Sequence, residues 1–309
     1  MTTTAAQPVS VLIPTIGRIP LLERCLESVL ACDPPPDEIV VVDQSGAADV
    51  VDLLRRLGVT RLRRVACDGR GTAAAMNVGL GAVRHDTMLV THDDCTVDRA
   101  WVGVGARLAA AAPGALITGR VLAPRDAEYV PSTKDDPVAR EHTGEVTTGL
   151  LYPANMVASR VALVELGGFD ERPGLLVAED NDLCYRWLIA GRRLRYEPEL
   201  VVWHHDWRTP DQLVRTHVAY ARGQGAFYAK HLCAGDRQVL DMLRWDLRQG
   251  LRAMVRGRLS RTPRWQDPYR EMVVWLLVGL VCGRSESRRL ARAQSVAGRG
   301  GYPSRRSRR

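Results

Sequence analysis

The sequence predicts an α/β fold, in which a mostly parallel sheet is covered by helices and followed by a helical C-terminal region. Short apolar runs alternate with amphipathic helical stretches over roughly the first 120 residues, which is typical of a parallel sheet. From Pro210 to about Gly283 the apolar residues are spaced as in helices. The chain has 309 residues and is 46% hydrophobic, enough for one large or two small domains with a real core.

The first part of the chain supplies the expected sheet. We predict strands at residues 9–13, 39–42, 61–66, 88–91 and 115–121, and helices at 18–31, 47–57, 71–84 and 99–111. The strands are short apolar runs of the kind that is buried on both faces, although 61–66 alternates weakly. Asp33-Pro34 ends the first helix and Gly58 the second.

The alternation stops after the last of these strands. Residues 123–148 are polar and rich in Pro, Asp and Thr, and they predict a long loop with a functional or mobile role. Further on we expect helices at 159–166 and 180–190 and strands at 194–196 and 200–203. The expected organisation is a sheet domain at 9–208 and a helical region at 209–283, with disordered ends at 1–8 and 284–309.

The positive charge of the chain is concentrated at its end. From Arg284 onward there are nine Arg and one Glu, which accounts for the whole net charge of +8. A basic tail can be a solvated end, or it can attract an anionic membrane surface. The apolar run Met272–Cys282 just before it is a candidate for peripheral membrane contact, because its eleven residues are too few for a span of roughly 20. We expect no nucleic-acid partner.

The cysteines and the N-terminus indicate the compartment. Seven Cys are scattered without metal-binding spacing, which favours a reduced, intracellular chain. Residues 1–8 lack the basic and apolar segments of a signal peptide. We therefore expect a cytoplasmic protein, with peripheral contact at the inner face of the cell membrane as an option; the high Arg and Ala content favours a bacterial source.

Polar residues follow four successive predicted strands. They are Pro14-Thr15, Asp43, Asp68-Gly69-Arg70-Gly71 and Asp93-Asp94. Open parallel sheets bind ligands at the carboxyl ends of their strands, so these residues predict one binding crevice. Asp43 suits a nucleobase or ribose, or alternatively a simple turn before Gly46. Arg70 and the following helix, which carries Asn77, suit a diphosphate at a helix N-terminus.

Two acidic clusters indicate the chemistry. A hard divalent cation prefers oxygen ligands and can bridge the two phosphates of a nucleotide diphosphate. We expect Asp94 to bind Mn2+ or Mg2+, while Asp93 contacts this nucleotide, which is the donor of the group that is transferred to an acceptor hydroxyl. One histidine of His204-His205 can complete the metal shell, and we favour His204. In Glu179-Asp180-Asn181-Asp182 we expect Asp180 to be a general base and Glu179 to contact the acceptor. Helix-dipole pairing is the alternative role for these acids.

The residues that bind the acceptor are the hardest to predict from the sequence. Residues 167–174 form a flexible, Gly-containing stretch before the second cluster. We expect Gly168 and Phe169 to line an acceptor pocket together with Asn155, and we expect the 123–148 loop and the helical region to contribute. The identity of the acceptor stays open among a lipid carrier, a polysaccharide end and a small molecule.

In this order and spacing, the motifs resemble the large family 2 of nucleotide-sugar glycosyltransferases, which have the GT-A fold. The resemblance covers Val9 to about His205 and includes Ile13-Pro14-Thr15, Val42-Asp43, Asp93-Asp94, Gly167-Gly168-Phe169-Asp170-Glu171 and Glu179-Asp180. It implies an inverting transfer by one in-line displacement, with Asp43 at the nucleobase, Asp94 at the metal and Asp180 as base. The chain departs from the family at the metal motif, where His92 and Cys95 flank the acidic pair.

Two other functions remain as alternatives. A nucleotidyltransferase that makes the nucleotide sugar has a similar sheet, but it usually carries a Gly-rich basic loop after the first strand, which residues 14–18 do not provide. An inactive nucleotide-binding scaffold would have no need of a placed base. A dehydrogenase is excluded, because the glycine turn after the first strand is absent.

Overall fold

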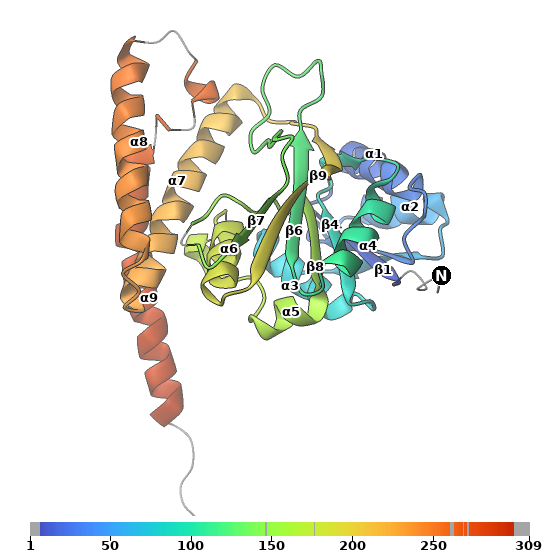
Figure 1. Cartoon of the computed structure of the whole chain (residues 1–309), viewed down its shortest axis with the longest axis horizontal. Coiled ribbons are helices and arrows are strands. Elements are labelled where there is room, and N and C mark those ends of the chain that lie inside the picture. Colours follow the sequence, from blue (N-terminus) through green and yellow to red (C-terminus); the bar gives the residue numbers. More distant parts are fainter. Residues whose placement is uncertain are drawn as a thin grey trace, which may run out of the picture. The chain divides into compact units, whose positions relative to one another are not determined.

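The structure is a computed structural model that describes residues 7–145, 147–175, 177–259, 263–267, 269–270 and 272–299. The chain divides into two compact units, residues 1–212 and 213–309. The first unit contains one sheet in the order β3-β2-β1-β4-β8-β6-β9-β5, with β7 beside β9 (Figure 1). The first four strands, β1 (Val9–Thr15), β2 (Glu38–Asp43), β3 (Leu62–Ala66) and β4 (Thr87–Thr91), are parallel to one another, as predicted.

The remaining strands make the sheet mixed. They are β5 (Cys95–Val97), β6 (Leu116–Leu122), β7 (Arg140–Thr143), β8 (Asn155–Ser159) and β9 (Arg193–His204). β8 lies antiparallel between β4 and β6, and β9 is parallel to β6 and antiparallel to β5. This arrangement brings the end of β9 beside the residues that follow β4.

Helices cover both faces of the sheet (Figure 1). Helices α1 (Ile19–Leu30), α2 (Ala48–Leu57) and α4 (Trp101–Ala111) share one buried apolar cluster with Val9, Val11 and Ile13 of β1. Helices α3 (Thr72–Ala82), α5 (Arg160–Glu165) and α6 (Glu179–Ile189) share the other cluster with Leu12. Because successive side chains of a strand point to opposite faces, β1 contributes to both cores.

The structure corrects several predicted elements. β5, β7 and β8 were not expected, and β7 lies within residues 123–148, which we predicted to be a loop. The two short strands expected at 194–196 and 200–203 are one continuous strand, β9, whose pairing with β6 shifts between Gly119 and Arg120. A short 3-10 helix at Pro173–Leu175 interrupts the predicted loop before α6.

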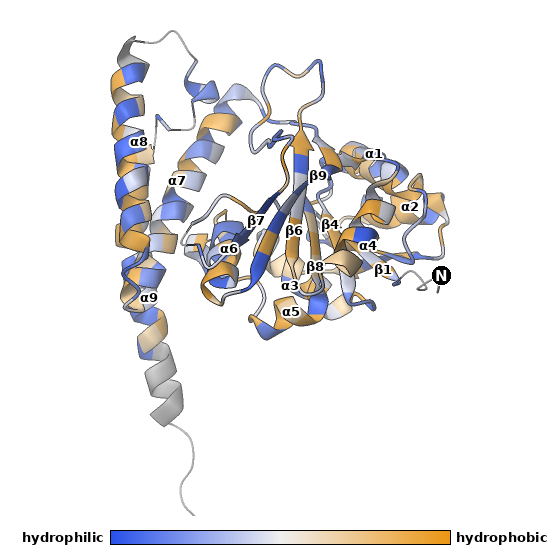
Figure 2. Ribbon diagram, in the orientation of Figure 1, coloured by the Kyte–Doolittle hydropathy of each residue, from blue (hydrophilic) through white to orange (hydrophobic). Residues whose placement is uncertain are grey.

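The second unit is helical. It consists of most of α7 (Pro210–Cys233), α8 (Val239–Leu259), a 3-10 turn at Arg264–Gln266 and α9 (Met272–Arg299). Glycines let α7 and α9 pack closely, since a Cβ on Gly225 would lie 2.0 Å from the carbonyl oxygen of Leu276 and one on Gly279 would lie 2.0 Å from that of Arg222. Polar and apolar residues alternate around α8 (Figure 2).

The chain ends differ from the prediction. Residues 284–299, which we expected to belong to a disordered tail, are part of helix α9. Residues 300–309 and 1–6 of the expected disordered ends lie outside the described residues, while Gln7 and Pro8 directly precede β1. None of the described helices combines the length and the apolar character that crossing a membrane requires.

Candidate active site

The carboxyl ends of the parallel strands meet at one edge of the sheet. The strand register pairs Thr15 of β1 with Asp43 of β2, and Asp43 with Ala66 of β3. The turns that follow continue this pairing: the Gln44 backbone N–H donates to the Thr15 carbonyl at 2.9 Å, and the Cys67 N–H donates to the Asp43 carbonyl at 2.9 Å. The polar residues after these strands are therefore neighbours, as the parallel order predicts.

The acidic pair after β4 lies beside the end of β1. The Thr15 hydroxyl donates to Oδ2 of Asp93 at 2.6 Å, and the Gly17 N–H donates to the Thr15 hydroxyl oxygen at 3.0 Å. Asp93 and Asp94 are only 1% and 4% exposed. Pro14 is buried in β1, where its register partner on β2 is Val42. Thr15 and Asp93, both expected at the donor, are thus joined directly.

Arg18 forms ion pairs with both carboxylates, a contact that the sequence analysis missed. Its Nη1 lies 3.0 Å from Oδ2 of Asp94, its Nε donates to Oδ2 of Asp93 at 3.3 Å, and its Nη2 pairs with Oδ1 of Asp93. The guanidinium also lies 4.7 Å from the ring centroid of Trp207. Because β1 and β4 are sheet neighbours, residues just after one can reach residues just after the other.

The pairing of β5 with β9 brings His204 to Asp94. Cys95 is the register partner of His204, and Nε2 of His204 lies 3.6 Å from Oδ2 of Asp94. Nδ1 of His204 lies 3.1 Å from the carbonyl oxygen of Pro131, which can only accept, so Nδ1 carries the proton in that contact. Nε2 then faces Asp94: it can donate a proton to that carboxylate, or, once that proton is lost, bind a metal through its lone pair.

His205 is turned to other partners. Its Nε2 lies 2.9 Å from the Thr96 hydroxyl and its Nδ1 lies 3.3 Å from Arg24. His92 approaches the acidic pair from the β4 side, and its buried Nε2 has no hydrogen-bond partner among the described residues. Of the two adjacent histidines, His204 is the one beside Asp94.

The residues around Asp94 fit a divalent cation in part. Burial alone would raise the pKa of Asp94, but the hydrogen bond and charge of His204 and the charge of Arg18 hold that pKa well below its usual value. Within the described ranges, no group of three or more His, Cys, Asp or Glu side chains is arranged to hold a metal ion. A cation at Asp94 and His204 would therefore take its other ligands from a substrate or water.

Asp43 is buried at the end of β2 with both oxygens engaged. Oδ1 accepts from the Ser45 N–H at 2.8 Å and from the Ser45 hydroxyl, and Oδ2 accepts from Nε of Arg64 at 2.8 Å. Arg64 lies on β3 and is a second contact that the sequence analysis missed. The structure places Asp43 beside the loop of Arg70, because Nε2 of Gln44 donates to the carbonyls of Gly69 and Gly71.

Arg70 and Asn77 lie in different surroundings. Arg70 is exposed in the loop before α3. Asn77 holds the 168–171 segment: its Nδ2 donates to the Phe169 carbonyl at 2.8 Å and to Glu171 at 2.7 Å, and its Oδ1 accepts from the Phe169 N–H at 2.9 Å. Its amide therefore positions the expected acceptor loop.

Glu179 and Asp180 open helix α6 next to the start of α3. The Thr72 side chain hydrogen-bonds Glu179, whose Oε2 is buried without a partner among the described residues. Burial raises the pKa of Asp180 to about 6. Burial and the Asp180 charge raise the pKa of Glu179 well above its usual value. Two adjacent carboxyls with raised pKa values suit proton transfer near neutral pH.

The expected acceptor residues are mostly buried. Gly168 has a φ of +66° and Phe169 is 2% exposed. Arg186 of α6 donates to the carbonyls of Leu166 at 3.0 Å and Gly168 at 2.7 Å. Asn155 is fully buried, accepting from Nε1 of Trp101 and donating to the carbonyls of Arg120 and Leu200.

Comparison with known proteins decides the family. The family model described as "Glycosyltransferase like family 2" matches residues 6–223. The chain belongs to this family. The resemblance drawn from the motifs is confirmed, and so is the expectation of a transferase at the level of the family.

Two curated relatives share one name. The pre-mycofactocin glycosyltransferases of two Mycobacterium tuberculosis strains, CDC 1551 / Oshkosh and ATCC 25618 / H37Rv, are each 32% identical over 161 residues. The matches cover 45% of this glycosyltransferase family member and 31% of each relative. The chain thus spans about a third of the length of the curated relatives it matches.

Solved structures confirm the GT-A fold. The mannosyltransferase PcManGT of Pyrobaculum calidifontis, in complex with GDP-Man and Mn2+, has a TM-score of 0.54 and 20% identity, with 97% of this chain and 77% of that one covered. TarS of S. aureus has a TM-score of 0.56 and 14% identity, with 96% and 93% covered. TarS in complex with UDP has a TM-score of 0.55 and 14% identity, with 93% and 92% covered.

Proposed function

We propose that this family member is a metal-dependent inverting glycosyltransferase. It moves a sugar from a nucleoside-diphosphate sugar to an acceptor hydroxyl, with metal at Asp94 and His204 and with Asp180 as base. The observation that carries the metal site is the approach of His204 Nε2 to Asp94 Oδ2 at 3.6 Å, with Nδ1 of the same ring held by the Pro131 carbonyl. The neighbour solved with GDP-Man and Mn2+ supports a nucleotide sugar and a divalent cation as the ligands.

The proposed residues divide the work between two sides of the crevice. When bound, the cation would stabilise the charge of the departing nucleoside diphosphate. Asp43 and the Arg70 loop lie where the nucleoside and diphosphate bind, and Asp93 supports the donor together with Thr15. On the other side, Asn77 and Arg186 hold the 166–169 segment so that Gly168 and Phe169 shape the acceptor pocket.

The transfer is one displacement. The Asp180 carboxylate accepts the proton of the acceptor hydroxyl, and the oxygen attacks the anomeric carbon from the face opposite the leaving group. The bond from that carbon to the β-phosphate oxygen breaks, and its electrons leave with the nucleoside diphosphate. The anomeric configuration therefore inverts. Because the Asp180 pKa is raised to about 6, its carboxylate is both present and basic near pH 7.

Donor binding by calorimetry tests the metal and donor parts. We would titrate UDP-, GDP- and dTDP-sugars with Mn2+, Mg2+ or EDTA into the full chain. We expect metal-dependent binding of one nucleotide class, lost in Asp94→Ala. Donor binding without turnover in Asp180→Asn supports the base. Full turnover in Asp180→Asn contradicts its role, and failure of every nucleotide to bind contradicts the donor site.

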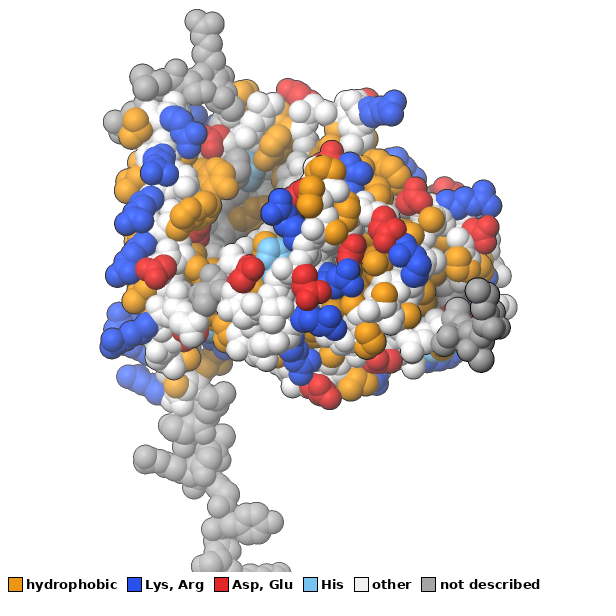
Figure 3. All heavy atoms as spheres, viewed as in Figure 1, with side chains coloured by type: hydrophobic (Ala, Val, Ile, Leu, Met, Phe, Trp, Pro, Cys, Tyr) orange, Lys and Arg blue, Asp and Glu red, His pale blue; other side chains and the backbone are white. Residues whose placement is uncertain are grey.

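We also propose a peripheral contact with an anionic membrane, through the exposed face of α8. Trp245, Leu251 and Val255 are 53%, 54% and 63% exposed, and Arg248, Arg252 and Arg256 are exposed beside them. Figure 3 shows basic side chains in a column over α8 with hydrophobic side chains between them. Basic and apolar side chains on adjacent sides of one helix suit an anionic lipid surface.

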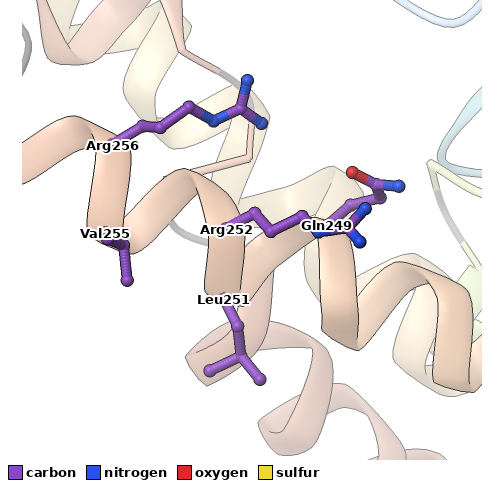
Figure 4. Close-up of a pocket in the computed structure, with 5 residues that line it drawn as sticks. All are labelled: Gln249, Leu251, Arg252, Val255 and Arg256. Atoms are coloured by element: carbon purple, nitrogen blue, oxygen red, sulfur yellow. The ribbon is translucent and has the colours of Figure 1, made fainter.

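A shallow hollow of about 710 Å3 lies on α8. All the residues that line it belong to this helix: Gln249, Leu251, Arg252, Val255 and Arg256. In Figure 4, Arg252 and Arg256 extend to one side while Leu251 and Val255 point to another. Co-sedimentation with phosphatidylglycerol vesicles tests the contact. We expect binding at low salt that is lost when Arg252 and Arg256 are changed to Glu, but kept in the matched pair Arg55→Glu and Arg56→Glu on α2. Equal binding by both pairs contradicts the proposal.

A further inference from the structure

Arg18 lies where a cation is needed. Three of its nitrogens contact three of the four oxygens of the Asp93 and Asp94 carboxylates. The Arg18 side chain is 21% exposed, and those of the two acids are 1% and 5% exposed. Two buried negative charges side by side are unfavourable unless they are paired, so the guanidinium is the counter-ion of this carboxylate pair.

The guanidinium is held by the acidic pair after β4 and by Trp207 after β9, and Thr15 of β1 orients one of the two acids. Thr15 of β1 donates to the same Asp93 Oδ2 that accepts from Arg18, which fixes that carboxylate. Trp207, after β9, lies against the guanidinium at 4.7 Å and donates its Nε1–H to Oδ2 of Asp94 at 3.2 Å. The Trp207 ring also contacts a second guanidinium, that of Arg208, which lies 4.9 Å from the ring centroid.

One oxygen is shared by all the competing groups. Oδ2 of Asp94 is contacted by Nη1 of Arg18 at 3.0 Å and by Nε1 of Trp207, and it is the oxygen that lies 3.6 Å from Nε2 of His204. A divalent cation bound between Asp94 and His204 would meet the positive charge of Arg18 at contact distance. Like charges at that distance repel strongly in a buried site.

We infer that Arg18 is an internal counter-ion that competes with the divalent cation for Asp94, and that the donor diphosphate relieves this competition. The inference rests on the proposed metal site at Asp94. The diphosphate offers Arg18 an alternative anionic partner with matching geometry, so the guanidinium can leave Asp94 as the cation arrives. Arg18 is thereby a positioning residue that makes metal and donor bind together.

The consequence is a measurable coupling between two ligands. Without nucleotide, the full chain binds Mn2+ weakly because Arg18 occupies its carboxylates. With a nucleoside diphosphate, Mn2+ affinity rises by a large factor, and by thermodynamic linkage the nucleotide gains the same factor from Mn2+. Removal of the guanidinium strengthens Mn2+ binding in the nucleotide-free chain and reduces the coupling.

Mn2+ titration followed by electron paramagnetic resonance tests this on the full chain. In Arg18→Gln, without nucleotide, we expect the Mn2+ Kd to fall on the order of tenfold or more, the scale at which an adjacent charge changes cation affinity of a carboxylate. Addition of GDP or UDP then increases Mn2+ affinity by a smaller factor than in the parent chain. Arg18→Lys keeps a charge that cannot bridge both acids, and its Kd falls between the two.

Controls separate the possible outcomes. Arg55→Gln removes one positive charge from α2, where Arg55 pairs with Asp52, and it leaves both the Mn2+ Kd and the coupling unchanged. If the parent chain binds Mn2+ through Asp94, as judged by loss in Asp94→Ala, and Arg18→Gln binds it no more tightly, the inference is overturned while the metal site stands. If neither chain binds Mn2+ with or without GDP or UDP, the metal site is overturned and the inference with it. A folded Arg18→Gln chain is confirmed by an unchanged circular dichroism spectrum, and Arg18→Lys provides the comparison if it does not fold.

Discussion

Asp94 is buried and Asp180 is half-buried at the start of α6, and their pKa values move in opposite directions. Burial raises the pKa of each, and at Asp94 this effect is outweighed by His204 and Arg18. At Asp180 burial outweighs the backbone hydrogen bonds, and the pKa rises to about 6. Two carboxyls whose pKa values are shifted apart by their surroundings can have different roles in one reaction. Asp94 stays an anion that binds cations, while Asp180 can exchange a proton.

The Asp180 pKa predicts the pH dependence of the reaction. A base acts in its deprotonated form, so turnover at saturating substrates rises as the pH increases through about 6 and is lost below it. Burial and the Asp180 charge also raise the pKa of Glu179 well above its usual value. Steady-state kinetics across pH measures the midpoint. Asp180→Asn lowers turnover by roughly 10²–10⁴ and removes the acid limb, and an acid limb that persists in it assigns the midpoint elsewhere.

Asn155 provides a stability prediction. Its amide satisfies the buried N–H of Trp101 and the carbonyls of Arg120 and Leu200. In Asn155→Ala these groups lose their partners, and we expect the free energy of unfolding to fall by about 3 kcal/mol. Urea denaturation measures the change. A raised KM for the acceptor without loss of stability would instead place Asn155 in the acceptor pocket, as the sequence suggested.

At the scale of elements, the sequence predicts what is locally determined. The strands β1 to β4 and the helices between them each follow from a run of apolar residues of the right period, and the structure has them within a few residues. β5 has three residues and β7 has the polar sequence REHT, so neither carries a local signal. Both pair with β9, at residues far along the chain, and only tertiary contact determines them.

The same distinction applies to the site. Asp93, Asp94 and Thr15 were predicted together because each follows a strand, and parallel strands end at one edge. Arg18 and Trp207 were missed because their roles depend on which strands are neighbours. The available signal was Arg18 directly after the first strand, which becomes informative once β1 and β4 are known to pair.

The glycines of the helical unit predict an element-scale effect. A Cβ on Gly279 would lie 2.0 Å from the backbone oxygen of Arg222, so α9 and α7 must separate in Gly279→Ala. We expect a loss of about 1–3 kcal/mol in the stability of these helices. Gly81, in α3, has open space where a Cβ would lie, and Gly81→Ala is expected to stabilise by about 0.5–1 kcal/mol. Thermal unfolding of both variants measures the difference, and equal shifts would contradict the close packing.

At the scale of the whole molecule, the chain consists of two compact units with separate interiors. The first has two apolar cores on either side of its sheet, and the second has helices packed through glycines. All the residues proposed to bind donor, metal and acceptor hydroxyl lie in the first unit. The exposed basic and apolar face of α8 lies in the second, so the chemistry and the proposed membrane contact are assigned to different units.

This division predicts how ligands affect unfolding. A ligand stabilises only the cooperative unit that binds it, by about 2.7 kcal/mol when its concentration is 100 times Kd. With Mn2+ and the nucleoside diphosphate that binds, scanning calorimetry of the full chain is therefore expected to show one transition that moves to higher temperature and one that does not. Gly279→Ala should lower only the transition that the ligands leave unchanged. A single transition that responds to both ligand and substitution would mean that the two units unfold as one, and that the α8 face and the carboxylate site are energetically linked.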